Sequence, residues 1–354
     1  MHKPAAFAHR RHGMSRSGST GVREMLSQSM TTKDHNKATL GILFVVAGIL
    51  AISVNDMLFK RLSGDYPLHE LVFLRSALGL VFSIALVRME GGLQILKTRR
   101  PFLHILRGLL IVAANMSYFA ALAALPLADA TALFFAAPLF ITLLSIPVLG
   151  EKVGVMRFSA VVVGFVGVVI MQRPWADADS LEASRIVLLL PVFAALTYAM
   201  TQLMTRKLGV ESKASALSVY IHAAFVVVSL GFFGIVGDGR YAAAFDDPSL
   251  QFLLRAWIWP DPADWWVIFG LGANAAIIGY CLSQAYRLAD AATVAPFEYL
   301  GLPLAVFWGW IIFAELPLFE VWLGMGLILA SGIFVFVREK QKARVVARAP
   351  VKRR

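Results

Sequence analysis

The stretch LADAATVAPFEYLGLPLAVFWGWIIFAELP, residues 288–317, is the part of the chain from which its fold can be worked out. From Ala291 to Ala314 it is long and apolar enough to cross a bilayer, and Glu298 is its one carboxyl or amine group. A carboxylate at that depth costs about 2.5–3.5 kcal/mol on insertion scales, so it calls for a specific role. Pro296 and Pro303 lie on either side of it, and each removes a backbone donor from the helix.

The composition of the whole chain is that of a membrane protein. Of its 354 residues, 58% are apolar and 16% are charged, against about 25% charged residues in ordinary soluble domains. The sequence therefore predicts an all-α polytopic membrane protein with ten transmembrane helices, since a helix needs about 20 apolar residues to span. The ten apolar runs are 38–54, 71–87, 101–125, 130–150, 153–172, 186–205, 214–237, 265–286, 288–317 and 321–337.

The distribution of Lys and Arg predicts the orientation. With the N-terminus inside, 25 of these residues fall on the inner side and 6 on the outer side, and Arg75 and Arg107 fall within spans. This asymmetry is the positive-inside pattern, so both termini are predicted to be cytoplasmic, with the protein in a bacterial inner membrane. Topology thereby accounts for the net charge of +11, and no nucleic-acid partner is predicted.

Four short matches in the same order indicate an internal repeat. They pair FKRL (59–62) with TRKL (205–208), AAN (113–115) with GAN (272–274), LADA (127–130) with LADA (288–291), and LGEK (149–152) with FAEL (313–316). Each repeat holds five helices, an odd number, so the second repeat is predicted to lie inverted, an architecture typical of transporters. The predicted units are a disordered tail (1–37), the first repeat (38–172), a linker (173–185), the second repeat (186–337) and a basic tail (338–354). In the LADA register, Glu298 corresponds to Ala137.

These motifs resemble a known family. The LGEK segment and the PFEYL…AELP segment (296–317) are similar to those of the drug/metabolite transporter superfamily, of the EamA-domain type, over residues 38–338. NDMLFK (55–60) followed by FLRS (73–76) resembles the branch that includes riboflavin and S-adenosylmethionine transporters. The resemblance implies a central cavity surrounded by helices 1–4 and 6–9, with helices 5 and 10 on the outside.

The candidate substrate-binding or proton-coupling residues are polar and aromatic groups within or next to the spans. Glu298 is expected either to face a cavity, where it would bind a cationic group or take up a proton, or to be hydrogen-bonded between helices. Asp56 is expected to pair with Lys60, one turn away, or to act in the site. Arg75 is expected to reach the interface, to neutralise Asp56 or to bind an anionic group. The full set is Glu298, Tyr299, Asp56, Asn115, Tyr118, Asn274, Tyr280, Arg75 and Trp308.

Two further groups have expected structural roles. Pro138, Pro296 and Pro303 are expected flex points in the fourth and ninth helices. Glu151 and Glu315, which follow those helices, are expected to anchor loops.

The predicted function is secondary transport of a small polar or aromatic metabolite by alternating access, leaning to vitamin or nucleoside-like solutes such as riboflavin or S-adenosylmethionine. The alternatives are export of amino acids, amines or drugs, and, in another class, a polytopic membrane enzyme or sensor. The sequence has no G-x-x-x-x-G-K-[ST], H-E-x-x-H or G-x-S-x-G motif, so no enzyme activity, metal or cofactor is predicted. The expected partners are the substrate, membrane lipid and a coupled proton; a homodimer is left open.

Overall fold

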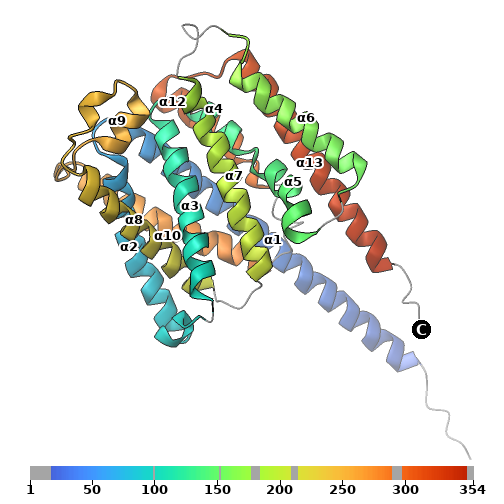
Figure 1. Ribbon diagram of the computed structural model, residues 1–354. Helices are drawn as coiled ribbons and strands as arrows, with labels where there is room; N and C mark the ends of the chain where they lie inside the picture. The colour runs from blue at the N-terminus through green and yellow to red at the C-terminus, as the bar shows by residue number, and fades with distance from the viewer. Residues whose placement is uncertain are drawn as a thin grey trace, which may run out of the picture.

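The computed structural model describes residues 17–98, 100–150, 153–176, 184–208, 214–288 and 297–348. Within these ranges the chain is helical, with short connections (Figure 1). The helices are α1 (Ser17–Leu62), α2 (Leu68–Glu90), η1 (Leu93–Leu96), α3 (Pro101–Leu122), α4 (Leu127–Phe134), α5 (Ala137–Leu149), α6 (Val155–Gln172), α7 (Arg185–Leu208), α8 (Ala214–Val236), η3 (Ala242–Ala244), α9 (Pro248–Leu254), α10 (Trp265–Leu288), α12 (Gly301–Phe313) and α13 (Phe319–Arg348).

The described helices account for a ten-helix membrane protein. Nine segments are long and apolar enough to span a bilayer, and α12 is a shorter apolar helix in the ninth position. The predicted fold class is therefore confirmed. The predicted boundary between a disordered tail (1–37) and the first helix is wrong. α1 begins at Ser17, within that tail. Residues 17–37 contain several good helix formers, so the first spanning helix extends beyond its apolar part.

The fourth spanning segment is a broken helix. α4 ends at Phe134, a turn occupies Phe135 and Ala136, and α5 begins at Ala137. Pro138 lies in the first turn of α5, where a missing backbone N–H costs nothing because no carbonyl precedes it in that helix. The ninth segment has the same form: helix at 297–298, a turn at Tyr299 and Leu300, and then α12. Such interruptions are tolerated in membranes where they line a cavity or are covered by protein.

α5 and α12 correspond residue by residue. Both contain 13 residues, and both end on a left-handed residue, Gly150 with φ 69° and Ala314 with φ 55°. Matching Gly150 with Ala314 places Phe135 opposite Tyr299 and Phe134 opposite Glu298. The LADA register, which matches Glu298 with Ala137, is therefore wrong at this position, because the two repeats differ in length between LADA and the break.

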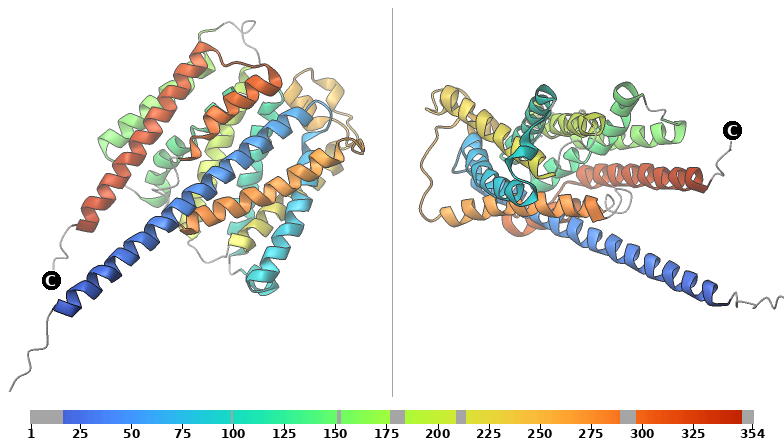
Figure 2. Two further views of the ribbon diagram at one scale, coloured as in Figure 1. Left: turned by 180° about the vertical axis from the view of Figure 1, so that it is seen from behind. Right: turned by 90° about the horizontal axis from the view of Figure 1, so that it is seen from below.

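The helices pair across the bundle as two inverted halves would. α2 packs on α8, and α6 packs on α13. The pair formed by α1 and α10 has its counterpart in the pair formed by α7 and α3. Figure 2 shows α6 and α13 together at one edge, away from α2, α8 and α10. Gly167 and Gly324 allow the α6–α13 contact, since a Cβ on Gly167 would lie 2.8 Å from the Gly324 carbonyl oxygen.

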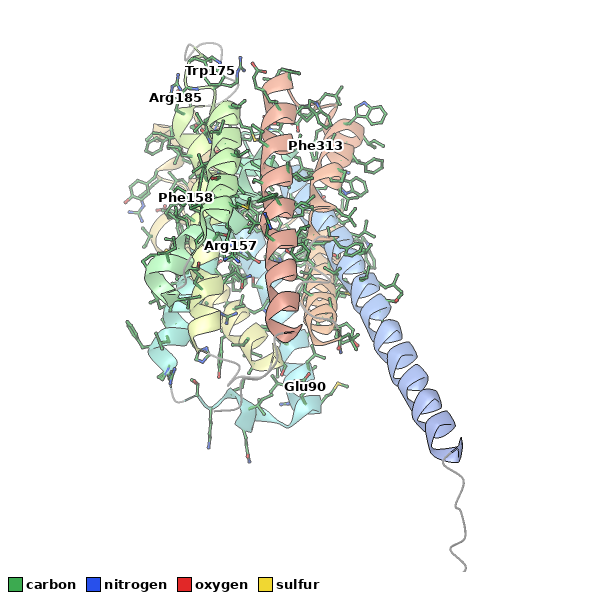
Figure 3. The ribbon with its side chains drawn as sticks, turned by 90° about the vertical axis from the view of Figure 1, so that its right-hand side faces the viewer. Glu90, Arg157, Phe158, Trp175, Arg185 and Phe313 are labelled. Carbon is green, nitrogen blue, oxygen red and sulfur yellow. The ribbon has the colours of Figure 1, made fainter. Side chains whose placement is uncertain are left out.

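The bundle has two ends, which are named here by residues. The Lys60 end holds the C-terminal end of α1 and the start of α2, and the Glu90 end holds the C-terminal end of α2 (Figure 3). The segment between α8 and α10 covers part of the Lys60 end. There the Tyr66 hydroxyl donates to Asp264 at 2.5 Å, and the backbone N–H of Ile258 donates to Glu70 at 3.1 Å.

Candidate functional site

A polar cluster centred on Asp56 lies where α1, α3 and α4 meet. The Tyr118 hydroxyl donates to the Asp56 carboxylate at 3.1 Å and lies 2.9 Å from the Thr131 hydroxyl. Thr131 in turn donates to the Leu127 carbonyl, one turn back in α4. The Asn55 amide donates to the other Asp56 oxygen at 3.1 Å. A carboxylate in the membrane interior is thus held by groups from two helices and is not left in lipid.

Arg75 of α2 completes the cluster. Its guanidinium lies over the rings of Phe59 and Phe119, at 5.6 and 5.7 Å from their centroids, and these two rings stack on each other at 3.8 Å. Its positive charge also acts on Asp56. That Arg75 neutralises Asp56 stays a prediction, and cation–π contact offsets part of the cost of burying the guanidinium.

Two buried atoms in this cluster have no hydrogen-bond partner among the residues that the structure describes. They are the amide oxygen of Asn55, a side chain that is only 3% exposed, and Nε of Arg75. Asn55 and Phe59 lie one turn apart on the same face of α1, and Arg75 lies on Phe59. An unpaired buried acceptor and an unpaired buried donor each cost about 1–3 kcal/mol, which a bound ligand or water can recover.

Aromatic rings run from this cluster to the second half of the chain. Phe134, the last residue of α4, lies 5.1 Å from the ring of Tyr118 and 5.4 Å from the ring of Tyr198 in α7. The side chains of Tyr118, Phe134 and Tyr198 thus form an aromatic belt. These distances are typical of interacting rings, and both interplanar angles are tilted.

Glu298 lies at the far end of the aromatic belt. Its charge acts on the hydroxyls of both Tyr198 and Tyr299, and the Tyr198 hydroxyl also accepts a hydrogen bond from Gln202 at 2.6 Å. Glu298 comes three residues before α12, whose N-terminal dipole favours a negative charge. The belt therefore joins two carboxylates, Asp56 and Glu298, that come from different halves of the chain.

The two helix breaks contact each other. Phe135 and Tyr299, the equivalent residues of the two breaks, stack with ring centroids 5.5 Å apart and an interplanar angle of 30°. Residues related by a two-fold axis touch each other only close to that axis. The stack therefore marks the centre of the pseudo-symmetric bundle, and the aromatic belt begins one residue away from it.

The other predicted site residues are distributed more widely. Asn274 donates to the Ala51 carbonyl at 2.7 Å and so ties α10 to α1, whereas Asn115 donates to Ile111 in its own helix. Trp308 donates to Ser53 at 3.2 Å, and Trp310 is exposed. These contacts hold α10 and α12 on α1.

Tyr280 lies away from the aromatic belt. It is 47% exposed and lines a small cavity of ≈ 60 Å³ between α2, α8 and α10, near the Glu90 end. Ser83 and Ser218, whose hydroxyls are 2.8 Å apart, line the same cavity.

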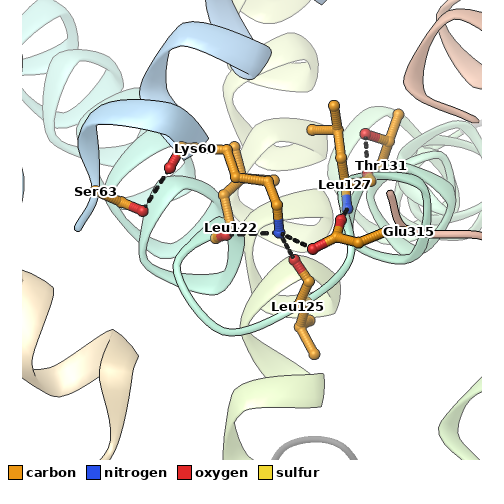
Figure 4. A network of polar contacts seen from close by, with 7 residues as sticks. All are labelled: Lys60, Ser63, Leu122, Leu125, Leu127, Thr131 and Glu315. Atoms are coloured by element: carbon orange, nitrogen blue, oxygen red, sulfur yellow. Dashed lines mark hydrogen bonds and ion pairs between the residues drawn. The ribbon is translucent and has the colours of Figure 1, made fainter. Parts of the chain in front are cut away.

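Lys60 pairs with Glu315 and not with Asp56, which corrects the expected pair one turn away. The Lys60 ammonium lies 3.0 Å from the Glu315 carboxylate and also donates to two backbone carbonyls of the α3–α4 connection (Figure 4). Asp56 is satisfied by Tyr118 and Asn55, so an ion pair within one helix is not needed. Glu315 anchors a loop, as expected; Glu151 lies outside the described residues.

Several residues of this site were not singled out from the sequence: Asn55, Phe59, Phe119, Thr131, Phe134, Phe135, Tyr198 and Gln202. Aromatic residues in an apolar run have the pattern of ordinary core residues, so Phe134 and Tyr198 give no separate signal. Asn55 directly precedes Asp56 inside a span, and that polar pair is a signal that could have been used. Among the described residues no group of three or more His, Cys, Asp or Glu side chains could hold a metal ion.

Comparison with known proteins agrees with this architecture. A family described as the EamA-like transporter family matches residues 39–173. The chain is 29% identical over 324 residues to a protein named riboflavin transporter from Rhizobium johnstonii, covering 90% of this chain and 98% of the relative. It is also 29% identical over 301 residues to a protein named S-adenosylmethionine uptake transporter from Rickettsia prowazekii. That alignment covers 85% of this chain and 94% of the relative.

A solved crystal structure shares the fold. It matches with a TM-score of 0.56 at 19% identity, covering 85% of this chain and 98% of that one. The relatives align over nearly their whole length and are named as transporters, not enzymes. Residues 39–173 are thus similar to the EamA-like transporter family, and the two relatives named as transporters align over most of the chain.

Proposed function

We propose that this protein carries a flat, polar, vitamin- or nucleoside-like metabolite across the membrane by alternating access. The observation that supports this most is the aromatic belt between two carboxylates, next to the breaks of two pseudo-symmetric helices. Broken helices near the middle of the membrane are the usual place for a transporter's substrate. Relatives named for riboflavin and for S-adenosylmethionine align over most of the chain.

The chemistry of the site suits such a substrate. Riboflavin and S-adenosylmethionine each combine a flat nitrogen heterocycle with a flexible polar arm. In the proposal, the heterocycle stacks on the aromatic belt, which gives affinity that depends little on the exact ring system. The unpaired atoms of Asn55 and Arg75 accept and donate hydrogen bonds at its edge, and Glu298 binds the polar or cationic arm.

Proton coupling is proposed at Glu298. A carboxylate in the membrane interior can be neutralised either by a proton or by a cationic substrate group, so the two would compete. Asp56, the other carboxylate, accepts hydrogen bonds from Tyr118 and Asn55, and the charge of Arg75 acts on it.

We further propose that the Lys60 end faces the outside of the inner membrane and that both termini are cytoplasmic. The Lys and Arg distribution supports this orientation. The repeat boundaries 38–172 and 186–337 are part of the same proposal, and the matched half-helices α5 and α12 support them.

Growth rescue tests the substrate class. The chain would be expressed in bacteria that require riboflavin and lack their own uptake, and in parallel strains that require S-adenosylmethionine or single amino acids. We expect rescue at low external riboflavin or S-adenosylmethionine. Rescue by amino acids alone, or none with protein present in the membrane, would overturn the proposal. Glu298→Gln is expected to reduce rescue, with Glu320→Gln, at the α6–α13 edge, as the matched control.

A further inference from the structure

The ammonium of Lys60 joins three segments at one end of the bundle. It lies 3.0 Å from Glu315, which follows α12 (Figure 4). It also donates to the carbonyl of Leu122, the last residue of α3, at 3.3 Å and to that of Leu125, before α4, at 2.6 Å. The ring of Phe313 lies 5.2 Å from the same nitrogen. One side chain of α1 thus binds the connection next to it in the first half and the end of α12 in the second half.

Glu315 completes this network, called here the Lys60–Glu315 latch. One carboxylate oxygen pairs with Lys60, and the other accepts the backbone N–H of Leu127 at 3.2 Å. That N–H belongs to the first turn of α4, where backbone donors have no partner within the helix. The side chains of Lys60 and Glu315 are only 10% and 30% exposed. Ionised hydrogen bonds that are shielded from water are stronger than exposed ion pairs.

The latch lies between the polar cluster and the Lys60 end. Lys60 comes one turn after Asp56 on α1, and Leu127 comes one turn before Thr131 on α4. Asp56 and Thr131 are the two groups that Tyr118 contacts. These contacts therefore tie α1, the end of α3, the start of α4 and the segment after α12 together beside the polar cluster.

We propose that the Lys60–Glu315 latch closes the Lys60 end and breaks in each transport cycle. The proposal rests on the proposed function, since alternating access requires contacts between the two halves to form and break at each end in turn. A purely structural anchor would instead stay intact in all states. The distinction is whether loss of the latch opens the interior or only weakens the fold.

Thiol accessibility separates these alternatives without any substrate. Cys281 is replaced by Ser, and Ser53, which is 6% exposed and lies two turns from Lys60 on the same helix face, becomes the reporter Ser53→Cys. A membrane-impermeant maleimide is applied from the side on which an exposed reference, Asp246→Cys, reacts. We expect slow labelling of Ser53→Cys in the parent, and labelling about tenfold faster after Glu315→Gln, which corresponds to about 1.4 kcal/mol.

Two variants make the outcome specific. Glu320→Gln removes the same charge from the pair with Arg173 at the α6–α13 edge and should leave labelling unchanged. Lys60→Arg keeps a cation with several donors and should retain most of the protection. The double variant with Lys60→Glu and Glu315→Lys should not restore protection from labelling, because the new carboxylate would then face two backbone carbonyls.

The proposal is overturned if Glu315→Gln labels as slowly as the parent. It is equally overturned if a second reporter, Ala195→Cys in the packed interior of the bundle, becomes reactive together with Ser53→Cys, because the pair would then only stabilise the fold. These labelling results stand apart from the substrate. Failure of growth rescue with a working latch would count against the proposed substrate class alone.

Discussion

At the scale of single residues, the candidate site depends on polar groups that the fold leaves partly unpaired. Asn55 and Arg75 each bury one atom that has no partner in the described part of the chain. Unpaired atoms of this kind destabilise the empty protein, so their presence beside an aromatic belt favours a ligand that supplies both missing hydrogen bonds. Asp56, in contrast, is fully engaged by its neighbours and holds the cluster together.

Replacing Asn55 by Ala should weaken substrate binding more than it weakens the fold. The change removes an acceptor that has no partner among the described residues. It also removes the hydrogen bond that the amide donates to Asp56, but Tyr118 and Arg75 still compensate that carboxylate, so the larger loss falls on the complex with substrate. We expect the KM for transport to rise about tenfold with little change in the maximal rate. Uptake kinetics of Asn55→Ala and of the control Asn115→Ala, whose amide bonds its own helix, provide the measurement. Equal effects of the two variants would contradict this role for Asn55.

Tyr66, outside the spans, gives a prediction for pH. Burial and the hydrogen bond to Asp264 raise the pKa of its hydroxyl above the usual value of about 10. Because the folded-state pKa is raised, the stabilisation is fully present below about pH 10 and is lost as the pH rises through the folded-state value. Tyr66→Phe should therefore lower the unfolding temperature by the same few degrees at pH 6 and pH 9. If the difference in unfolding temperature between Tyr66→Phe and the parent disappeared between pH 6 and pH 9, the raised pKa of Tyr66 would be contradicted.

At the scale of elements, the ninth spanning segment has the same break as the fourth. Each break is followed by a half-helix of 13 residues that ends on a left-handed residue. The first copy uses glycine there and the second uses alanine, for which a left-handed backbone costs about 1–2 kcal/mol. The second half therefore carries backbone strain at a position where the first half has none.

Two opposite substitutions test this reading of the half-helix ends. Gly150→Ala should destabilise the protein by about 1 kcal/mol, through the backbone, because no atom of the described residues beyond its chain neighbours lies within 4 Å of the added Cβ. Ala314→Gly should stabilise it by a somewhat smaller amount, because glycine loses more entropy on folding. Thermal unfolding in detergent measures both. Changes in the same direction for the two variants would mean that the ends are not equivalent.

The sequence predicted the ten spans and pointed to Pro138 and Pro303 at the starts of the half-helices, because length, hydropathy and proline act locally. Pro296 lies outside the described residues. It could not predict the register between the two copies. LADA gave one register and LGEK/FAEL another, and only the helix ends place Glu298 opposite Phe134. The partner of Lys60 was missed for a similar reason: Glu315 is close in space but distant in sequence, whereas Asp56 is close in sequence.

At the scale of the whole molecule, the two halves share a scaffold but differ in chemistry. The helix pairs recur in both halves, α1 with α10 and α7 with α3. Next to the breaks, however, one half presents the ring of Phe134 and the other the carboxylate of Glu298, and both approach Tyr198. A substrate between them would meet an aromatic face on one side and a negative charge on the other, which suits a flat heterocycle with a polar or cationic arm.

Uptake into proteoliposomes tests whether the aromatic belt binds the transported compound. Radiolabelled riboflavin and S-adenosylmethionine would be offered to vesicles containing the wild-type protein, Phe134→Ala or the control Glu320→Gln. We expect saturable uptake of at least one compound by the wild type and by Glu320→Gln. For Phe134→Ala we expect kcat/KM to fall about tenfold, because a base–aromatic contact contributes about 1–3 kcal/mol. Uptake of neither compound, or equal uptake by Phe134→Ala and the wild type, would contradict this prediction.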